Sequence, residues 1–158
     1  MVSSVVLKEW IMQQKQDESL LEKDFTVQGG DFIHAGEVSS RIKSILKEVG
    51  MSHDIIRRAS IATYEAEMNI VCYAKRGVFH LAITPDRLTV VAEDEGQGIE
   101  NIELAMQEGY STSSSAIKEM GFGAGMGLPN IKRNTDELLI SSVVGEGTRV
   151  AMVIFTQR

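Results

Sequence analysis

The sequence contains little cysteine, and it has no long hydrophobic run and no surplus of basic residues. Its one cysteine, Cys72, excludes an internal disulfide and any zinc site built from several cysteines. No stretch approaches the roughly 20 apolar residues that a membrane-spanning helix needs. The first residues, MVSSVVL, lack the basic opening and the apolar run of a secretory signal peptide. We therefore expect a soluble, cytoplasmic protein that does not contact a membrane.

The charge of the chain is acidic, with 22 Asp and Glu against 16 Lys and Arg and a formal net charge of −6. Nucleic-acid binding favours a basic surface that neutralises phosphates, so this charge argues against a nucleic-acid partner. A few local donors can still bind a single nucleotide. The length of 158 residues, of which 43% are hydrophobic, suits one globular domain with its own core.

Hydrophobic periodicity predicts an α+β domain over residues 24–158, preceded by an N-terminal extension over residues 1–23. The extension is expected to form a short helix around Trp10 that packs on the domain or binds a partner. The later elements are expected as a strand over 25–27, helices over 31–49 and 52–74, strands over 78–84 and 87–93, a short helix over 101–107, a mobile loop over 109–126, a helix over 128–134, and strands over 137–144 and 149–156. This order predicts a two-layer sandwich in which helices cover one face of a mostly antiparallel sheet.

The second predicted helix of this domain carries Glu65 and Asn69, which lie on the same helix face because they are four residues apart. An amide oxygen is a hard, neutral ligand that suits Mg²⁺, which takes few protein ligands beside phosphate oxygens and water. A carboxylate one turn away could accept a proton from an attacking hydroxyl. Glu and Asn at this spacing are also common on solvated helix faces, so the pair depends on the motifs that follow it.

A second motif, EDEGQGI, follows a predicted apolar strand and contains Asp94, Gly96, Gly98 and Ile99. An aspartate at a strand end can accept a hydrogen bond from an exocyclic amine such as that of adenine. Two glycines allow the backbone to approach a planar base closely. A glycine-rich acidic turn would explain the same residues.

A third motif places glycine at every second position, at Gly121, Gly123, Gly125 and Gly127, before Leu128. Glycine loses much backbone entropy on folding, so such a run weakens a structure unless the bare backbone is needed. Exposed N–H groups before the Leu128 helix would bind an anion, and a triphosphate is the natural occupant. No Gly-Lys-Ser/Thr follows, which excludes a Walker loop. A flexible hinge is the other interpretation.

Together with Gly147-Thr148, the order of these motifs resembles that of the GHKL ATPase superfamily over about residues 24–156. Within it, the chain is most similar to the small serine/threonine switch kinases of sigma-factor regulation, particularly the stressosome type. The segments that carry this similarity are EAEMNIVCYAKRG from Glu65, AEDEGQGI from Ala92 and EGYSTS from Glu108. The resemblance implies the Bergerat ATP-binding fold, with ATP and Mg²⁺ as cofactors.

The resemblance also implies roles for single residues. Glu65 would be the catalytic base, Asn69 the Mg²⁺ ligand and Asp94 the residue that reads adenine. The other nucleotide-binding residues would be Gly96, Gly98 and Ile99 at the base, Thr148 at the base through water, and Thr112, Gly121, Gly123, Gly125, Gly127 and Leu128 around the phosphates. The chain departs from the family pattern in its glycine lid, which is lengthened by Ser113–Met120 and by Phe122.

Other GHKL activities fit the sequence less well. Its three histidines, His34, His53 and His80, do not lie on a helical hairpin upstream of the ATP site, as a histidine kinase requires. A base such as Glu65 also assists transfer to a hydroxyl, whereas an imidazole nitrogen needs none. A mechanical ATPase would need transducer domains.

The sequence therefore predicts a kinase that transfers the γ-phosphate of ATP to a Ser or Thr of a partner protein. The family resemblance implies that this partner is a STAS-type antagonist or another sigma-regulatory protein. The alternative is a non-catalytic, ATP-dependent switch that sequesters a regulatory partner. Whether the chain forms a homodimer stays open.

Overall fold

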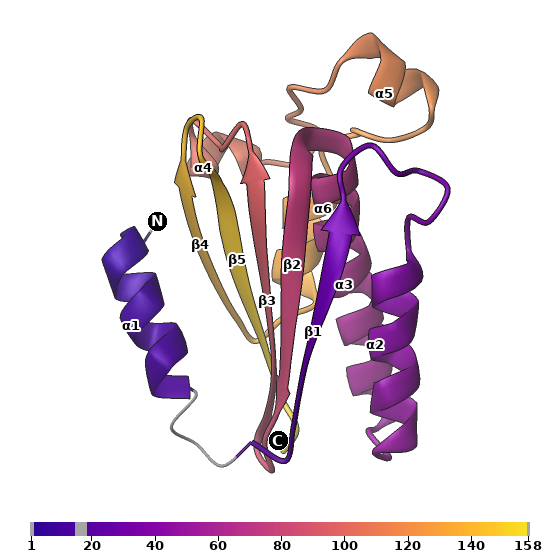
Figure 1. Cartoon of the computed structure of the whole chain (residues 1–158), viewed down its shortest axis with the longest axis vertical. Coiled ribbons are helices and arrows are strands. Elements are labelled where there is room, and N and C mark those ends of the chain that lie inside the picture. The colour runs from indigo at the N-terminus through magenta and orange to yellow at the C-terminus, as the bar shows by residue number, and fades with distance from the viewer. Residues whose placement is uncertain (1, 15–18, 158) are drawn as a thin grey trace.

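The computed structural model describes residues 2–14 and 19–157. Five strands form one sheet in the order β1-β2-β3-β5-β4, and every neighbouring pair is antiparallel (Figure 1). The strands are β1 (Leu21–Gln28), β2 (Ala74–Ile83), β3 (Arg87–Gly96), β4 (Glu137–Val143) and β5 (Gly147–Phe155). The predicted α+β class and antiparallel sheet are confirmed.

Three helices cover one face of this sheet: α2 (Glu37–Glu48), α3 (His53–Tyr73) and α6 (Gly127–Arg133) (Figure 1). The buried face of α3 is rich in small side chains, among them Ala59, Ala62 and Ala66. Small side chains let a helix lie close to a sheet, and α3 contacts β1, β2, β3 and β5. Alternate residues of the strands point toward the helices and complete the core, including Phe79, Leu81, Leu88, Val90 and Met152.

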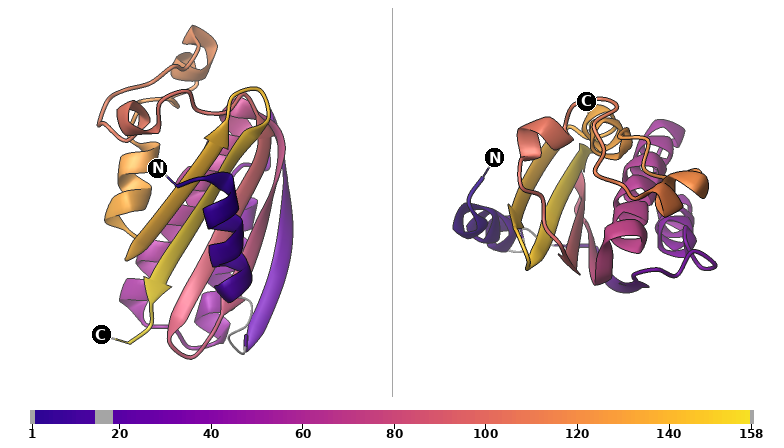
Figure 2. Two further views of the ribbon diagram at one scale, coloured as in Figure 1. Left: turned by 90° about the vertical axis from the view of Figure 1, so that its left-hand side faces the viewer. Right: turned by 90° about the horizontal axis from the view of Figure 1, so that it is seen from above.

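The N-terminal helix α1 (Ser4–Gln14) lies on the opposite face of the sheet (Figure 2). Leu7 is fully buried there and packs with Val91 of β3 and Ala151 of β5. Trp10 and Ile11 pack against the same cluster. The second face of the sheet is therefore partly covered, which the expectation of helices on one face did not include.

The first predicted helix of the domain begins later than expected, because α2 starts at Glu37 and not at residue 31. In the preceding loop the Asp31 carboxylate accepts a hydrogen bond from the backbone N–H of His34 (3.2 Å) and contacts its Nδ1 at 2.8 Å. Gly36 then adopts a left-handed conformation, with φ 94°. These local contacts compete with helix formation over residues 31–36.

A buried carboxylate from α3 caps the start of α2. The Glu67 side chain belongs to a residue that is 1% exposed. Its Oε1 accepts hydrogen bonds from the backbone N–H groups of Gly36 (3.0 Å) and Val38 (3.1 Å), and its Oε2 accepts one from Ser39 (2.8 Å). The first N–H groups of a helix have no partner within the helix, so Glu67 satisfies them and fixes α2 to α3.

Two further segments differ from the sequence prediction. Strand β1 is longer than residues 25–27 and begins at Leu21, because its polar residues also pair with β2, over residues 76–83 of that strand, at the edge of the sheet. The predicted loop over 109–126 contains the short helix α5 (Ser115–Glu119), which the Ser114 side chain caps. The predicted short helix over 101–107 is α4 (Ile102–Ala105). No helix in the described part of the chain is long and apolar enough to span a membrane.

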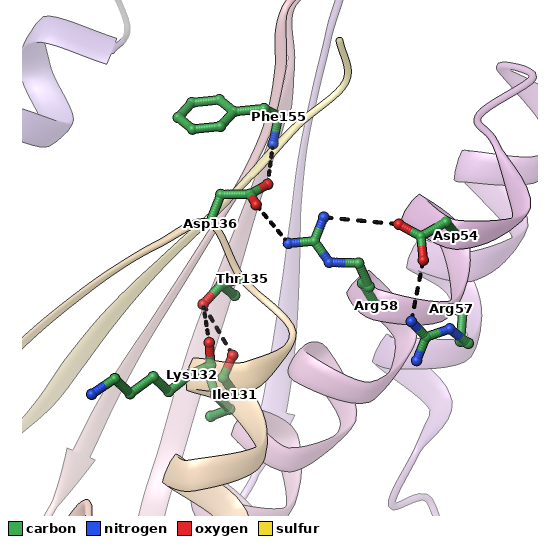
Figure 3. A network of polar contacts seen from close by, with 8 residues as sticks. All are labelled: Asp54, Arg57, Arg58, Ile131, Lys132, Thr135, Asp136 and Phe155. Carbon is green, nitrogen blue, oxygen red and sulfur yellow. Dashed lines mark hydrogen bonds and ion pairs between the residues drawn. The ribbon is translucent and has the colours of Figure 1, made fainter. Parts of the chain in front are cut away.

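At the end of the domain far from α5, a buried arginine ties α3 to the sheet (Figure 3). Arg58 donates to Asp136 Oδ1 at 2.8 Å, and its side chain is 8% exposed. The other oxygen of Asp136 accepts the backbone N–H of Phe155 at 2.8 Å. The neighbouring pair Arg57–Asp54 is exposed. Arg58 therefore links the first turns of α3 to β4 and β5.

Candidate functional site

The candidate site is built along one face of α3. Glu65, Asn69 and Tyr73 recur at intervals of four residues, so their side chains share this face, which extends about 12 Å along the helix. Gly127, at the start of α6, lies against the first two. A Cβ atom at Gly127 would lie 3.3 Å from Asn69 Oδ1 and 3.5 Å from Glu65 Oε2. The structure therefore brings together Glu65, Asn69 and the end of the glycine run.

The Glu65 carboxylate is held in place by a residue that sequence reasoning missed. Asn130 of α6 donates from Nδ2 to Glu65 Oε1 at 2.8 Å. Asn130 Oδ1 in turn accepts from Arg133 at 3.1 Å, which orients the amide. Glu65 is half-buried, and its other oxygen faces Gly127. One carboxylate oxygen is thus anchored while the other lies beside the glycine run.

Asp94 lies at the end of β3, on the sheet face that α3 covers. Its Oδ1 accepts the backbone N–H of Thr148 at 3.2 Å. Burial raises the pKa of the Asp94 carboxyl, and hydrogen bonds from the backbone of Thr148 and Gly96 oppose that rise. Gly147 packs directly on Asp94, since a Cβ atom there would lie 1.9 Å from the Asp94 carbonyl oxygen. Only glycine fits at position 147.

The Asp94 end of the site meets α3 at its last turn. A Cβ atom at Gly96 would lie 3.1 Å from the Tyr73 carbonyl oxygen and 2.8 Å from Asp94 Oδ1. Asp94 and Gly96 therefore lie at one end of the α3 row, and Glu65 and Asn69 lie at the other. Between them the row offers Tyr73, a residue that the four-residue spacing from Asn69 could have identified.

Two turns meet beside Asp94, and Ser142 of β4 joins them. The Ser142 hydroxyl accepts the backbone N–H of Ile99 at 2.7 Å, donates to the Gly147 carbonyl at 3.0 Å, and contacts Thr148 Oγ1 at 2.8 Å. A backbone hydrogen bond from Gly145 to Gln97 (2.8 Å) links the same two turns. Of the predicted residues, Thr148 contacts Asp94, and Ile99 is joined to Thr148 through Ser142, which the sequence analysis missed. Gly98 packs against the turn after β4.

The glycine-rich lid over residues 109–126 is held by side chains. The Tyr73 hydroxyl contacts the Ser113 hydroxyl, which also lies 3.4 Å from the Gly123 carbonyl. Phe122 stacks on Phe32 in the loop before α2, with ring centroids 5.7 Å apart. The first contact is made by Ser113 and the second by Phe122, and both residues lie in the segments that lengthen the lid. These contacts connect the lid to α3 and to the loop before α2.

The remaining predicted residues differ in their surroundings. Gly125 accepts the backbone N–H of Gly109 at 2.9 Å, which closes the base of the lid. Leu128 is 7% exposed and its side chain belongs to the core, so only its backbone could face a ligand. Thr112 and Gly121 are exposed in the lid, and they are not among the residues that these contacts bring together.

The described residues contain no group of three or more His, Cys, Asp or Glu side chains placed to hold a metal ion. Asn69, predicted as a Mg²⁺ ligand, could serve only in a site where phosphate oxygens and water supply most ligands, as is usual for Mg²⁺. The side chains present fit such a site, because Asn69 Oδ1 lies beside Gly127 at the end of the glycine run.

A separate cleft of about 450 Å³ lies along β1 and the first turns of α2, away from Asp94. Its charged groups are largely engaged, since Asp31 pairs with His34 and Glu67 caps α2. Hydrogen bonding to His34 lowers the pKa of Asp31, and Asp31 raises that of His34. This cleft contains neither Glu65 nor Asn69, so it is not the candidate site.

Comparisons with known proteins match the same part of the chain. Residues 31–154 match the family described as histidine kinase-like ATPase domain. The chain is 36% identical over 115 residues to the serine/threonine-protein kinase RsbT of Bacillus subtilis. This match covers 70% of the chain and 80% of RsbT. It is 33% identical over 102 residues to an anti-sigma F factor of Caldanaerobacter subterraneus, covering 61% of this chain and 68% of that protein.

A solved structure supports the fold. A chain in the crystal structure of the SiaB–SiaC complex from Pseudomonas aeruginosa matches with a TM-score of 0.60 and 18% sequence identity. The match covers 96% of this chain and 100% of that chain. At this identity the likeness concerns the arrangement of helices and strands.

Proposed function

The chain belongs to the histidine kinase-like ATPase domain family, and on this premise we propose that it is an ATP-dependent protein serine/threonine kinase. The name of the Bacillus subtilis relative, a serine/threonine-protein kinase, supports this activity. We further propose that the substrate is a regulatory protein of the STAS type, which agrees with the anti-sigma factor relatives.

The observation that carries the proposal is the single line of polar groups along α3. Asp94 and Thr148 lie at one end of this line, where a carboxylate can accept from the amino group of adenine. Asn69 and Glu65 lie at the other end, against Gly127. This separation supports a proposed base-binding end at Asp94 and a proposed phosphate-binding end at Asn69 and Glu65.

We propose a task for each group in this arrangement. The backbone of the lid would contact the phosphates, and Asn69 would hold Mg²⁺, which neutralises charge on the phosphates. A serine hydroxyl of the partner would attack the γ-phosphorus, forming a new O–P bond as ADP leaves. The Glu65 oxygen that faces Gly127 would accept the hydroxyl proton, while Asn130 holds the other oxygen.

The experiment is phosphate transfer from labelled ATP to the partner that co-purifies with the chain from its native host. Wild type should place label on a serine or threonine of the partner. Glu65→Gln keeps an oxygen for Asn130, so it should bind ATP normally but transfer phosphate at least about 100-fold more slowly. Glu103→Gln, which changes an exposed acid on α4, is the matched control and should transfer at the wild-type rate.

Two outcomes would change the assignment. Transfer by Glu65→Gln at the wild-type rate would remove Glu65 from the role of base. Nucleotide-dependent binding of the partner by wild type without any label would replace the kinase by a non-catalytic switch. The stacking of Phe122 on Phe32 gives that alternative a physical basis, because it connects the lid to the loop before α2.

A further inference from the structure

Two hydroxyl groups face each other beside Asp94 at the base-binding end of the site. Ser142 of β4 and Thr148 of β5 are direct cross-strand partners, and their hydroxyl oxygens lie 2.8 Å apart. Either atom could donate in this contact when the pair is considered alone. The other neighbours of Ser142 decide which one does.

Ser142 has one hydroxyl proton and two lone pairs. The Ile99 backbone N–H can only donate, so Ser142 accepts in that 2.7 Å contact. The Gly147 carbonyl can only accept, so the Ser142 proton is used in that 3.0 Å contact. The contact between the two hydroxyls must then be made with the proton of Thr148. Thr148 Oγ1 is left with lone pairs and no proton for a ligand.

This polarity makes Thr148 Oγ1 an acceptor toward the base. The Asp94 carboxylate, when ionised, also accepts hydrogen bonds and donates none. The two groups are close, because the backbone N–H of Thr148 donates to Asp94 Oδ1 at 3.2 Å. A pair of acceptors complements a purine that carries an amino group at C6, as adenine does, and opposes one that carries a carbonyl there, as guanine does.

We infer that Ser142 is a specificity-determining residue, which makes the site select adenine over guanine by orienting the Thr148 hydroxyl as an acceptor. This inference rests on the proposed ATP site. Ser142 affects base discrimination through the Thr148 hydroxyl that it orients. Ser142 is not expected to affect phosphate transfer, because Glu65 and Asn69 lie at the other end of α3.

The test compares ATP and GTP affinity in Ser142→Ala and in the matched control Ser141→Ala, which removes the neighbouring hydroxyl from the opposite face of β4. Ser142→Ala should weaken ATP binding about 10-fold while GTP binding changes less than about 3-fold, because the freed Thr148 proton can then point at the base. Ser141→Ala should keep the wild-type ratio of the two affinities.

A second pair of variants tests whether Ser142 acts through Thr148. In a Thr148→Val background, the further change Ser142→Ala should leave the ratio of ATP to GTP affinity unaltered. The inference is overturned if Ser142→Ala leaves the ratio unchanged, if it weakens both nucleotides equally, or if it still shifts the ratio when Thr148 is valine. Wild type that binds neither nucleotide would instead overturn the ATP site, together with the inference built on it.

Discussion

Replacing Glu67 with glutamine perturbs the contact that holds α2 to the helix of the candidate site. The carboxylate of Glu67 is almost fully buried and accepts three backbone hydrogen bonds from the first turn of α2. Glutamine has nearly the same shape, so the change creates no cavity. It replaces one acceptor oxygen with an NH₂ group that donates.

The size of the effect follows from which bonds survive. The glutamine oxygen can keep the position that accepts from Gly36 and Val38, and its NH₂ group then faces the N–H of Ser39. One hydrogen bond to a charged group is lost, and the Ser39 N–H and the glutamine NH₂ then face each other as two buried donors, for a cost of about 3 kcal/mol. For a domain of this length the melting temperature should fall by roughly 6–12 °C.

Thermal unfolding followed by circular dichroism measures this change directly. Glu37→Gln is the control, because Glu37 lies in the same first turn of α2 but is exposed. Its melting temperature should stay within about 2 °C of wild type, as expected for a surface charge near a helix N-terminus. Equal melting temperatures for wild type and Glu67→Gln would refute the reasoning, since the three hydrogen bonds would then contribute nothing.

Two further predictions concern the network in Figure 3 and the titration of Asp94. Arg58→Ala should destabilise the fold by about 3 kcal/mol in urea unfolding, because it removes a buried guanidinium and its ion pair with Asp136. The exposed neighbour Arg57→Ala should cost less than about 1 kcal/mol. Equal costs would contradict this account. Burial raises the pKa of Asp94 in the folded state, so the folded protein binds this proton more readily than the unfolded chain does. The stability that this group contributes therefore falls as pH rises from the pKa of the unfolded chain toward the raised pKa of the folded state. Asp94→Asn should therefore melt at a higher temperature than wild type at neutral pH, and the difference should shrink as pH falls below that window. A variant that melts lower at neutral pH would reject this sign.

The motifs of the candidate site could be predicted because they are local patterns. Glu65 and Asn69 share a helix face by their spacing, and the structure places them together beside Gly127. Asp94 was expected at a strand end, and it lies at the end of β3. The roles of these residues in binding and catalysis stay predictions that the experiments above address.

The contacts that support the motifs could not be predicted, because each joins segments distant in sequence. Asn130 is 65 residues from Glu65, and Ser142 is 43 residues from Ile99. Glu67 lies between Glu65 and Asn69 and looks like another solvated charge. Two residues along a helix turn the side chain by about 200°, so Glu67 points away from the site and into the start of α2.

The face of the sheet on which α1 packs could not be predicted either. The apolar residues Leu7, Trp10 and Ile11 predict a helix with one apolar face. Nothing in that pattern says which face of the sheet it covers. The structure places it on the face opposite α2 and α3, where Val91 and Ala151 would otherwise be uncovered.

The central claim is that Asp94 binds the adenine of ATP, and a calorimetric titration of ATP with Mg²⁺ tests it most directly. Wild type should bind, and Asp94→Asn should bind at least about 10-fold more weakly, because a hydrogen bond to a charged acceptor is lost. Equal affinities for the two proteins, or no binding of ATP by wild type, would contradict the account.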